Sequence, residues 1–155
     1  MASTLTTGNM GGVAGADTLC QNAADSAALG GTYKAFLGVG AALPQDRVAH
    51  FDGPYVRTDG VTVVPNWTHF DPLFPDLLAP IDKTETGGIP PTGTATYLGQ
   101  PATWVGYYWG TCSDWTDATF GNWGGIGAVQ WTQSLWYFGG ANHCSETAAL
   151  YCFEQ

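Results

Sequence analysis

The sequence predicts a single α+β domain in which short mixed strands, one or two helices and long loops are crosslinked by disulfides. Three observations lead to this class: a helical pattern over residues 14–29, short segments of alternating apolar residues, and four cysteines between positions 20 and 152. The 155 residues are enough for one domain with its own core. We therefore expect residues 1–155 to form one domain, in which the small and polar residues 1–12 are a flexible lead-in.

The first predicted element is the helix over residues 14–29. Apolar side chains recur there at i, i+3, i+4 and i+7, on Cys20, Ala23, Ala24 and Ala27. Asp17 lies in the first turn, where the helix dipole stabilises a carboxylate, and Gly30 and Gly31 provide the stop. A face of alanines allows close approach, so this helix should pack tightly on a sheet.

Two strand signals follow in the first half of the chain. Residues 32–39 alternate, with one side formed by Tyr33, Ala35, Leu37 and Val39. Residues 54–64 predict a β-hairpin with Asp59 and Gly60 in its turn.

The second half is predicted to be less regular. Residues 65–101 contain Pro65 and six further prolines, which favours an ordered segment with little regular secondary structure. Residues 103–105 predict a short strand, and residues 148–153 predict the closing strand. Between them, residues 106–143 mix aromatic, small and polar residues without a helical period.

The charge balance excludes several classes of partner. The net charge is −9, because thirteen acidic residues face only four basic ones. A chain without a basic patch is a poor ligand for nucleic acid or for an anionic membrane surface. No apolar stretch approaches the roughly 20 residues of a membrane span, so we expect no membrane insertion.

The cysteines predict disulfides and hence an exported protein, extracellular or at the cell surface. Their spacings of 92, 32 and 8 residues contain no pair typical of a zinc site. No signal peptide precedes Met1, so export is inferred from the cysteines alone. Four cysteines allow three pairings. A nested pairing would bring the termini together and leave a tryptophan-rich loop on a crosslinked core, which is a layout typical of a binding module.

Several segments resemble one known family. They are residues 10–17 (MGGVAGAD), Cys20, residues 31–37 (GTYKAFL), 104–106 (WVG), 112–116 (CSDWT), Cys144 and residues 150–154 (LYCFE). Their order and spacing resemble the endostatin domain of collagens and the bacterial endostatin-like surface proteins. The resemblance covers nearly the whole chain, although residues 40–100 match loosely.

The resemblance implies a C-type lectin-like, endostatin-like fold with two nested disulfides, Cys20–Cys152 and Cys112–Cys144. The bacterial proteins are adhesins, so the resemblance also implies recognition of matrix or complement proteins. Collagen endostatins hold heparin with arginines and zinc with N-terminal histidines. This chain has two arginines and no histidine within residues 1–12, so we expect neither activity.

No cofactor is predicted. Sugar-binding C-type lectins hold calcium with a Glu-Pro-Asn or Gln-Pro-Asp triplet, whereas the triplet at residues 100–102 (Gln-Pro-Ala) lacks the carboxylate and lies at the wrong place in the order. Calcium needs a cage of oxygen ligands, and Asp114 and Asp117 supply only two carboxylates. We therefore expect these two aspartates to organise loop backbone, with a calcium-dependent sugar site as the alternative.

The region around the second cysteine pair carries the candidate ligand site. Nine aromatic rings lie there: Tyr107, Tyr108, Trp109, Trp115, Trp123, Trp131, Trp136, Tyr137 and Phe138. Flat rings can stack on the apolar faces of sugars or anchor a protein interface. We expect at least half of the rings to be buried and one of residues 136–138 to be exposed. The predicted ligand-binding residues are Asp114, Trp115, Asp117, Asn122, Trp123, Trp136, Tyr137 and Asn142.

Other chemistries have weaker signals. His50 and His69 are each followed two residues later by an aspartate, Asp52 and Asp71, but such pairs are common by chance and no metal site is predicted. No nucleophile-elbow or oxyanion motif accompanies the serines near His143, so we expect no enzymatic activity.

We therefore expect a non-enzymatic, adhesin-type module that binds a glycan or glycoprotein on another cell or matrix. The alternative is a structural role as the terminal or trimerising domain of a fibrous surface protein, at the tip of a fibre, in which the chain forms a homotrimer through a larger parent protein.

Overall fold

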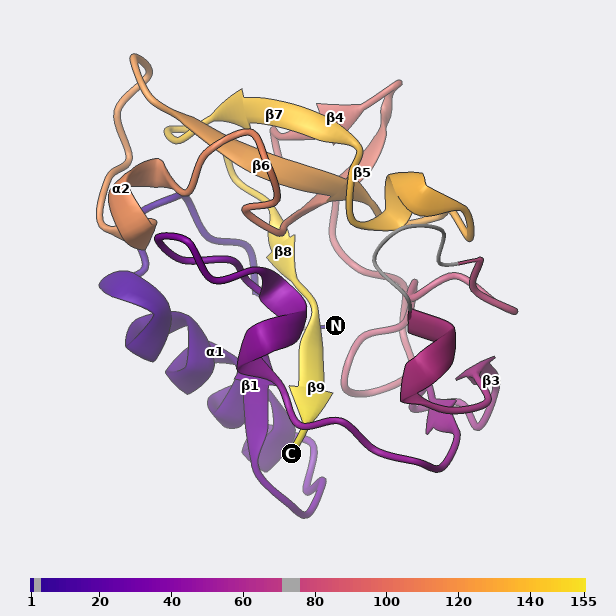
Figure 1. Cartoon of the computed structure of the whole chain (residues 1–155). Coiled ribbons are helices and arrows are strands. Elements are labelled where there is room, and N and C mark those ends of the chain that lie inside the picture. Colours follow the sequence, from indigo (N-terminus) through magenta and orange to yellow (C-terminus); the bar gives the residue numbers. More distant parts are fainter. Residues whose placement is uncertain (2–3, 71–75) are drawn as a thin grey trace.

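The computed structural model describes residue 1, residues 4–70 and residues 76–155, and it has a mixed α+β fold (Figure 1). The helices are α1 (Gly12–Ser26) and α2 (Cys112–Trp115), with short 3-10 helices η1 (Pro44–Arg47), η2 (Trp67–Phe70) and η3 (Ser134–Trp136). The strands are β1 (Tyr33–Ala35), β2 (Tyr55–Val56), β3 (Thr62–Val64), β4 (Thr96–Tyr97), β5 (Gln100–Trp104), β6 (Trp123–Ala128), β7 (Gly140–His143), β8 (Ala149–Leu150) and β9 (Cys152–Glu154).

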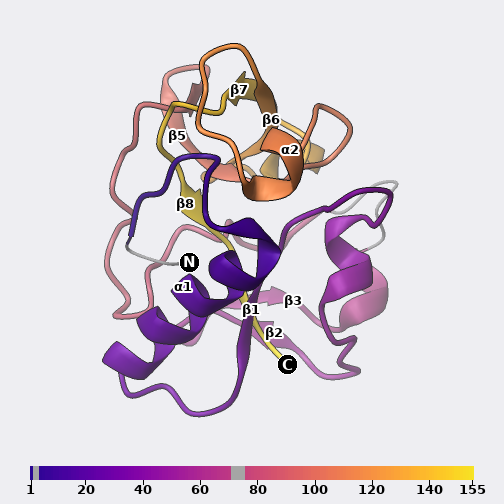
Figure 2. The same ribbon diagram turned by 90° about the vertical axis from the view of Figure 1, so that its left-hand side faces the viewer.

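The largest sheet of the described residues is built around β5 and β6. β6 lies between β5 and β7 and is antiparallel to both. The other side of β5 pairs with β4 near its start and with β8, in parallel, near its end. Two smaller sheets pair β1 with β9 and β2 with β3. Figure 2 shows α1 and β1 at one end of the molecule and α2, β6 and β7 at the other.

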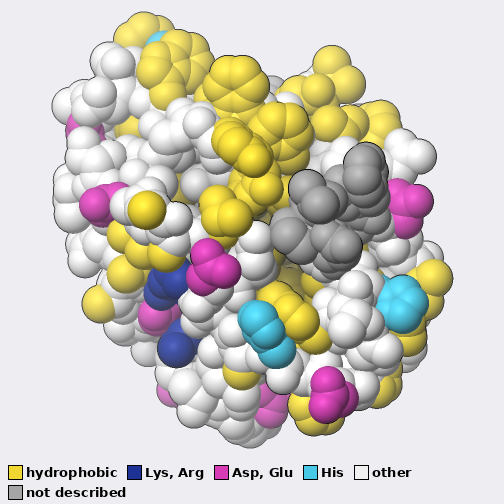
Figure 3. All heavy atoms as spheres, viewed as in Figure 1, with side chains coloured by type: hydrophobic (Ala, Val, Ile, Leu, Met, Phe, Trp, Pro, Cys, Tyr) yellow, Lys and Arg dark blue, Asp and Glu magenta, His cyan; other side chains and the backbone are white. Residues whose placement is uncertain are grey.

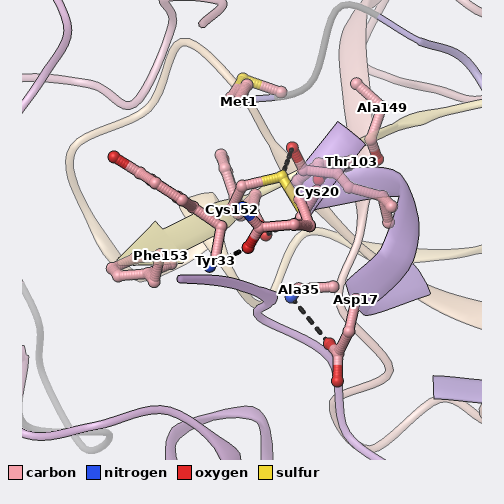
Figure 4. Close-up of a disulfide and its surroundings, with 12 residues drawn as sticks. Met1, Asp17, Cys20, Tyr33, Ala35, Thr103, Ala149, Cys152 and Phe153 are labelled. Carbon is pink, nitrogen blue, oxygen red and sulfur yellow. Dashed lines mark hydrogen bonds between the residues drawn. A yellow bond between two sulfur atoms is a disulfide. The ribbon is translucent and has the colours of Figure 1, made fainter. Parts of the chain in front are cut away.

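The C-terminal segment joins the two ends of the fold. β8 pairs with β5 in the large sheet, and β9 then pairs antiparallel with β1, against which α1 packs. The disulfides are Cys20–Cys152, with Cα atoms 5.4 Å apart, and Cys112–Cys144, with Cα atoms 5.6 Å apart. The nested pairing is therefore present, and the first bond ties α1 to β9 (Figure 4).

The lead-in prediction is wrong for the described residues of the N-terminal segment. The N–H of Gly8 donates to the carbonyl of Cys144 (2.8 Å), and that of Met10 donates to the carbonyl of Trp115 (2.9 Å). Thr6 also forms a β-bridge with Ala148. The small polar residues suggested an N-terminal segment without contacts to the domain. In the structure their small size lets this segment pack closely on the domain, since a Cβ added to Gly8 would lie 2.4 Å from the Sγ atom of Cys112.

The first helix is confirmed, but its ends and the role of Asp17 differ from the prediction. α1 begins at Gly12, so Asp17 lies beyond the first turn, where its carboxylate accepts from the N–H of Ala35 (2.9 Å) and from Arg47 (2.9 Å). At the other end, Ala28 adopts a left-handed conformation, with φ 56°, before the predicted glycine stop is reached. The N–H of Leu29 then bonds back to the carbonyl of Ala24 (2.9 Å), which closes the helix.

The predicted first strand is shorter than its alternating pattern. β1 ends at Ala35, and the next two side chains are both buried, although in different hydrophobic clusters. Phe36 packs with Trp136 and Phe153, whereas Leu37 packs with the residues around α1. Alternation of buried and exposed side chains therefore stops after Ala35, because the chain there lies between the two hydrophobic clusters and both of the next side chains are buried. The hairpin prediction is confirmed: β2 and β3 are antiparallel, and Gly60 in the turn has φ 84°.

The tryptophan-rich segment is not a loop that hangs from the core. It contains β6 and β7, and β6 is a central strand of the large sheet. β6 has the sequence WGGIGA, and its glycines permit close packing. A Cβ added to Gly125 would lie 2.8 Å from the backbone N of Tyr107, and one added to Gly127 would lie 1.8 Å from the carbonyl oxygen of Trp136. Glycines carry no hydrophobic signal, so the pattern does not reveal this strand.

Two buried tyrosines predict a loss of stability at alkaline pH. Burial raises the pKa of Tyr107 to about 12, helped by its hydrogen bond with Tyr108, and burial raises the pKa of Tyr151 further. An unfolded tyrosine has a pKa of about 10. The folded state therefore holds these protons more tightly, so the contribution of these two tyrosines to the free energy of unfolding should be constant below pH ~10 and fall as the pH rises through 12. Urea unfolding at a series of pH values measures this.

Tyr151→Phe is the matched variant for that experiment. Among the described residues the hydroxyl of Tyr151 has no hydrogen-bond partner, so its removal should leave the stability at pH 7 unchanged or slightly higher. The variant should also lose less stability between pH 10 and pH 12, because one titrating group is gone. Equal alkaline losses in the two proteins would contradict the assignment to Tyr151.

Candidate functional site

The candidate site begins at α2, which is a left-handed turn. Cys112, Ser113, Asp114 and Trp115 have φ values of 49°, 53°, 55° and 66°. Such a conformation costs non-glycine residues roughly 1–2 kcal/mol each, so tertiary contacts must hold it. The first residue is fixed by its disulfide and the last by burial of its ring.

Asp114 organises this turn. Its carboxylate accepts from the hydroxyl of Thr111 (3.0 Å) and from the N–H of Gly40 (2.9 Å), while its own N–H donates to the Thr111 hydroxyl (3.2 Å). These bonds connect α2 to the segment that follows β1. The aspartate therefore has the loop-organising role expected from the sequence.

Asp117 organises the next loop. Its carboxylate accepts from the N–H of Thr119 (2.7 Å), from the hydroxyl of Thr119 (3.2 Å) and from the side-chain amide of Asn122. The amide of Asn122, followed by the Thr119 N–H, lowers the pKa of Asp117, so this exposed carboxyl group stays ionised at neutral pH. Both oxygens already accept hydrogen bonds. In the described part of the chain, no group of three or more His, Cys, Asp or Glu residues is placed to hold a metal ion.

Three of the predicted ligand-binding residues belong to the core, which corrects the prediction. Trp115 is fully buried and donates from its indole N–H to the carbonyl of Gly38 (2.7 Å). Trp136 is 1% exposed and packs against Phe36, and Tyr137 is 6% exposed. Burial of rings of this size removes a large apolar area from water, which stabilises the fold and leaves these three rings inaccessible to a ligand.

Trp123 is exposed and belongs to a surface cluster. We define the first aromatic cluster as Phe120, Trp123 and His143, of which the first two are 68% and 48% exposed. The His143 ring lies 3.7 Å from the Phe120 ring and 3.8 Å from the Trp123 ring, between centroids. Trp123 and His143 are cross-strand partners on β6 and β7, so the sheet itself sets this geometry. Sequence analysis missed Phe120 and His143 as parts of the site.

Polar groups lie beside the first aromatic cluster. Asn122 is exposed and immediately precedes Trp123, and its backbone carbonyl accepts from the N–H of Cys144 (2.9 Å). Asn142 precedes His143 on β7, is half-buried and donates to the carbonyl of Thr96 (3.2 Å). The structure therefore brings Asp117, Asn122 and Trp123 together, whereas Asn142 is engaged with β4.

A second aromatic cluster consists of Tyr108, Trp109 and Phe138, which are 77%, 53% and 36% exposed. The Phe138 ring lies 5.6 Å from that of Tyr108 and 6.3 Å from that of Trp109. Figure 3 shows hydrophobic side chains gathered at the end of the molecule formed by β4, β6 and β7. The expected exposed ring among residues 136–138 is therefore Phe138. Of the nine rings, four are buried and Trp131 is half-buried, slightly less than the expected burial.

The other histidines have separate surroundings. His50 stacks on Trp67, with ring centroids 4.0 Å apart, and Nδ1 of His69 lies 2.7 Å from Oδ1 of Asn66. Asp52 is exposed, and Asp71 lies outside the described residues.

Comparison with known proteins gives a limited match. Residues 3–68 are similar to a family model described as a protein of unknown function (DUF1554). No curated protein matches the chain. The matched segment contains α1 and β1–β3, whereas both aromatic clusters lie outside it. No helix among the described residues is long and apolar enough to cross a membrane.

Proposed function

We propose that the chain is an extracellular or cell-surface recognition module with an endostatin-like fold of the C-type lectin-like class. The pairing of β9 with β1 beside Cys20–Cys152 supports this fold, as does the second disulfide between α2 and the end of β7. Two disulfides support an oxidising environment. We propose no catalytic role, because within the described residues the histidine rings hydrogen-bond to a backbone carbonyl and to an amide oxygen, and none bonds to a serine or an acidic side chain.

The first aromatic cluster carries the proposal. Phe120 and Trp123 offer exposed flat rings, and the exposed amide of Asn122 and the ionised carboxyl group of Asp117 lie next to them in the chain. A sugar stacks its apolar face on such rings and hydrogen-bonds its hydroxyls to amides and carboxylates. We therefore propose adhesin-type binding of a glycan or glycoprotein. Because Asp114 and Asp117 accept hydrogen bonds within the protein, the binding should not depend on calcium.

A glycan array tests this function. The purified oxidised protein should bind a subset of glycans equally well with calcium and with a chelator. Trp123→Ala should weaken binding of the strongest glycan at least about tenfold, because a central aromatic anchor contributes more than about 1.4 kcal/mol. Its thermal midpoint should stay within about 2 °C of wild type, since the ring is 48% exposed.

Trp109→Ala is the matched control, because it removes a similarly exposed indole from the second aromatic cluster. Its affinity should stay within about twofold of wild type. The absence of binding to every glycan on the array and to every protein in a panel of matrix proteins would contradict the proposed function. Equal losses in the two variants would contradict the assignment to the first aromatic cluster.

A further inference from the structure

The sheet formed by β1 and β9 has two outer edges. Its register pairs Tyr33 with Glu154 and Ala35 with Cys152. One residue beyond each end of this register there is a hydrogen-bonded pair. The N–H of Phe36 donates to the carbonyl of Tyr151 (2.9 Å), and the N–H of Gln155 donates to the carbonyl of Thr32 (2.8 Å). Hydrogen-bonded and non-hydrogen-bonded pairs alternate in an antiparallel ladder. The backbone groups of Tyr33, Ala35, Cys152 and Glu154 therefore point outward.

The outer edge of β1 is capped by side chains. The amide oxygen of Gln21 accepts from the N–H of Tyr33 (2.8 Å), and Asp17 accepts from the N–H of Ala35 (2.9 Å; Figure 4). Arg47 donates to the carbonyl of Ala35 (3.1 Å) and forms an ion pair with Asp17 (2.9 Å). This edge can accept no further strand.

The outer edge of β9 has no such caps. Within residues 1, 4–70 and 76–155, β9 pairs with β1 alone, and no hydrogen bond reaches the N–H or C=O groups of Cys152 or Glu154. Proteins usually cover, shorten or charge such an edge, because it is a template for another strand.

A groove runs along this open edge. It has a volume of about 510 Å³, and residues 152–155 form one part of its lining. Apolar side chains of α1, of the β2–β3 hairpin and of the segment before residue 85 form much of the rest, among them Ala23, Ala24, Val56 and Ile81. Figure 4 shows the disulfide of this region with Met1 and the Tyr33 ring beside it. Ligand sites in proteins typically have this size.

The rim of the groove and the side chains next to it carry more acidic than basic groups. Arg57 lines the groove but is outnumbered by its two ion-pair partners, Asp59 (2.7 Å) and Asp82 (2.6 Å). The lining itself is balanced, with Arg57 and Lys83 against Glu85 and Glu154, so the excess of acidic groups comes from Asp59 and Asp82. The chain's charge of −9 adds a long-range attraction for cations.

We propose that this groove binds an extended, basic peptide segment of a partner protein, which adds as a strand to the open edge of β9. The outward N–H and C=O groups of Cys152 and Glu154 bond to the peptide backbone, as in other cases of strand addition. Alternate peptide side chains contact the alanines of α1 and the apolar residues of the hairpin, and basic side chains meet the acidic rim. The site is separate from the aromatic clusters.

Fluorescence polarisation with a labelled Lys-Val-Thr-Val-Lys-Val peptide amide tests the proposal. A copy that is N-methylated at its four central residues keeps the side chains and charge but cannot form the backbone bonds. The methylated copy should bind at least tenfold more weakly, and a Glu-Val-Thr-Val-Glu-Val peptide should also bind at least tenfold more weakly. Equal binding of the methylated and unmethylated peptides would overturn strand addition and indicate that the groove recognises peptide side chains alone.

Two protein variants test the edge itself. Glu154→Pro removes the outward N–H but keeps those of Phe153 and Gln155 that face β1. Glu154→Gln loses the same charge and keeps the N–H. The proline variant should bind the basic peptide at least tenfold more weakly than the glutamine variant, and equal affinities would overturn the proposal.

Hydrogen exchange of the wild-type protein gives a readout that does not depend on folding of a variant. The peptide should slow exchange at the amides of Cys152 and Glu154, and unchanged exchange there at saturating peptide would overturn the proposal. Trp123→Ala should bind the peptide with the affinity of the wild-type protein, because Trp123 does not line the groove. A protein that binds no glycan can therefore still bind the peptide, and the two proposals are tested separately.

Discussion

Gly127→Ala should destabilise the protein by about 3 kcal/mol or more. The added Cβ would lie 1.8 Å from the carbonyl oxygen of Trp136 and 2.6 Å from its carbonyl carbon. Both atoms are backbone, so no side-chain rotation relieves the clash. Either η3 must move away from β6, which opens the core around the Trp136 ring, or β6 must leave its register with β5. Urea unfolding followed by tryptophan fluorescence measures the change in the free energy of unfolding.

Gly121→Ala is the control for this substitution. A Cβ at Gly121 would meet nothing within 4 Å, and its φ lies outside the left-handed region. Its free energy of unfolding should stay within about 0.5 kcal/mol of wild type. A Gly127→Ala protein as stable as Gly121→Ala would contradict the packing of η3 on β6. A Gly127→Ala protein that does not fold would agree with the prediction.

Removal of the Cys20–Cys152 disulfide should have the largest effect among crosslink variants. The bond closes a segment with a sequence separation of 132 residues, whereas Cys112–Cys144 closes one of 32 residues. The chain-entropy model assigns the longer loop about 5 kcal/mol and the shorter one about 4 kcal/mol. A domain of this size is stabilised by only about 5–15 kcal/mol. The paired substitution Cys20→Ala with Cys152→Ala should therefore leave little stability.

The matched comparison is the paired substitution Cys112→Ala with Cys144→Ala, checked by a thiol assay for the disulfide that remains. Both pairs of cysteines are mostly buried, so the cavity contributions are similar and the loop lengths dominate the difference. The variant without Cys20–Cys152 should have the lower urea midpoint. A lower urea midpoint for the variant without Cys112–Cys144 would contradict this prediction. It would indicate that this disulfide stabilises the left-handed turn of α2 by more than its loop length accounts for.

The sequence alone determined the features that depend on local spacing. The alanine-rich face predicted α1, Asp59 and Gly60 predicted the hairpin turn, and the cysteines predicted a disulfide-bonded domain. The consecutive rings of residues 136–138 also predicted one exposed ring. These signals come from the period of one element or from the conformational preference of single residues, so they do not depend on distant parts of the chain.

The tertiary structure decided the features that depend on neighbours far along the chain. β6 is a strand because its glycines let Trp136 and Tyr107 approach, and no periodic pattern records that approach. Trp115 is buried and Trp123 is exposed although they lie only eight residues apart, because the Trp115 indole packs inside the fold and donates to the distant carbonyl of Gly38. The same holds for the sheet of β1 and β9, in which Asp17, Gln21 and Arg47 cap the outer edge of β1 and the outer edge of β9 has no such caps within the described residues. Burial and capping are properties of the assembled fold, which local spacing cannot specify.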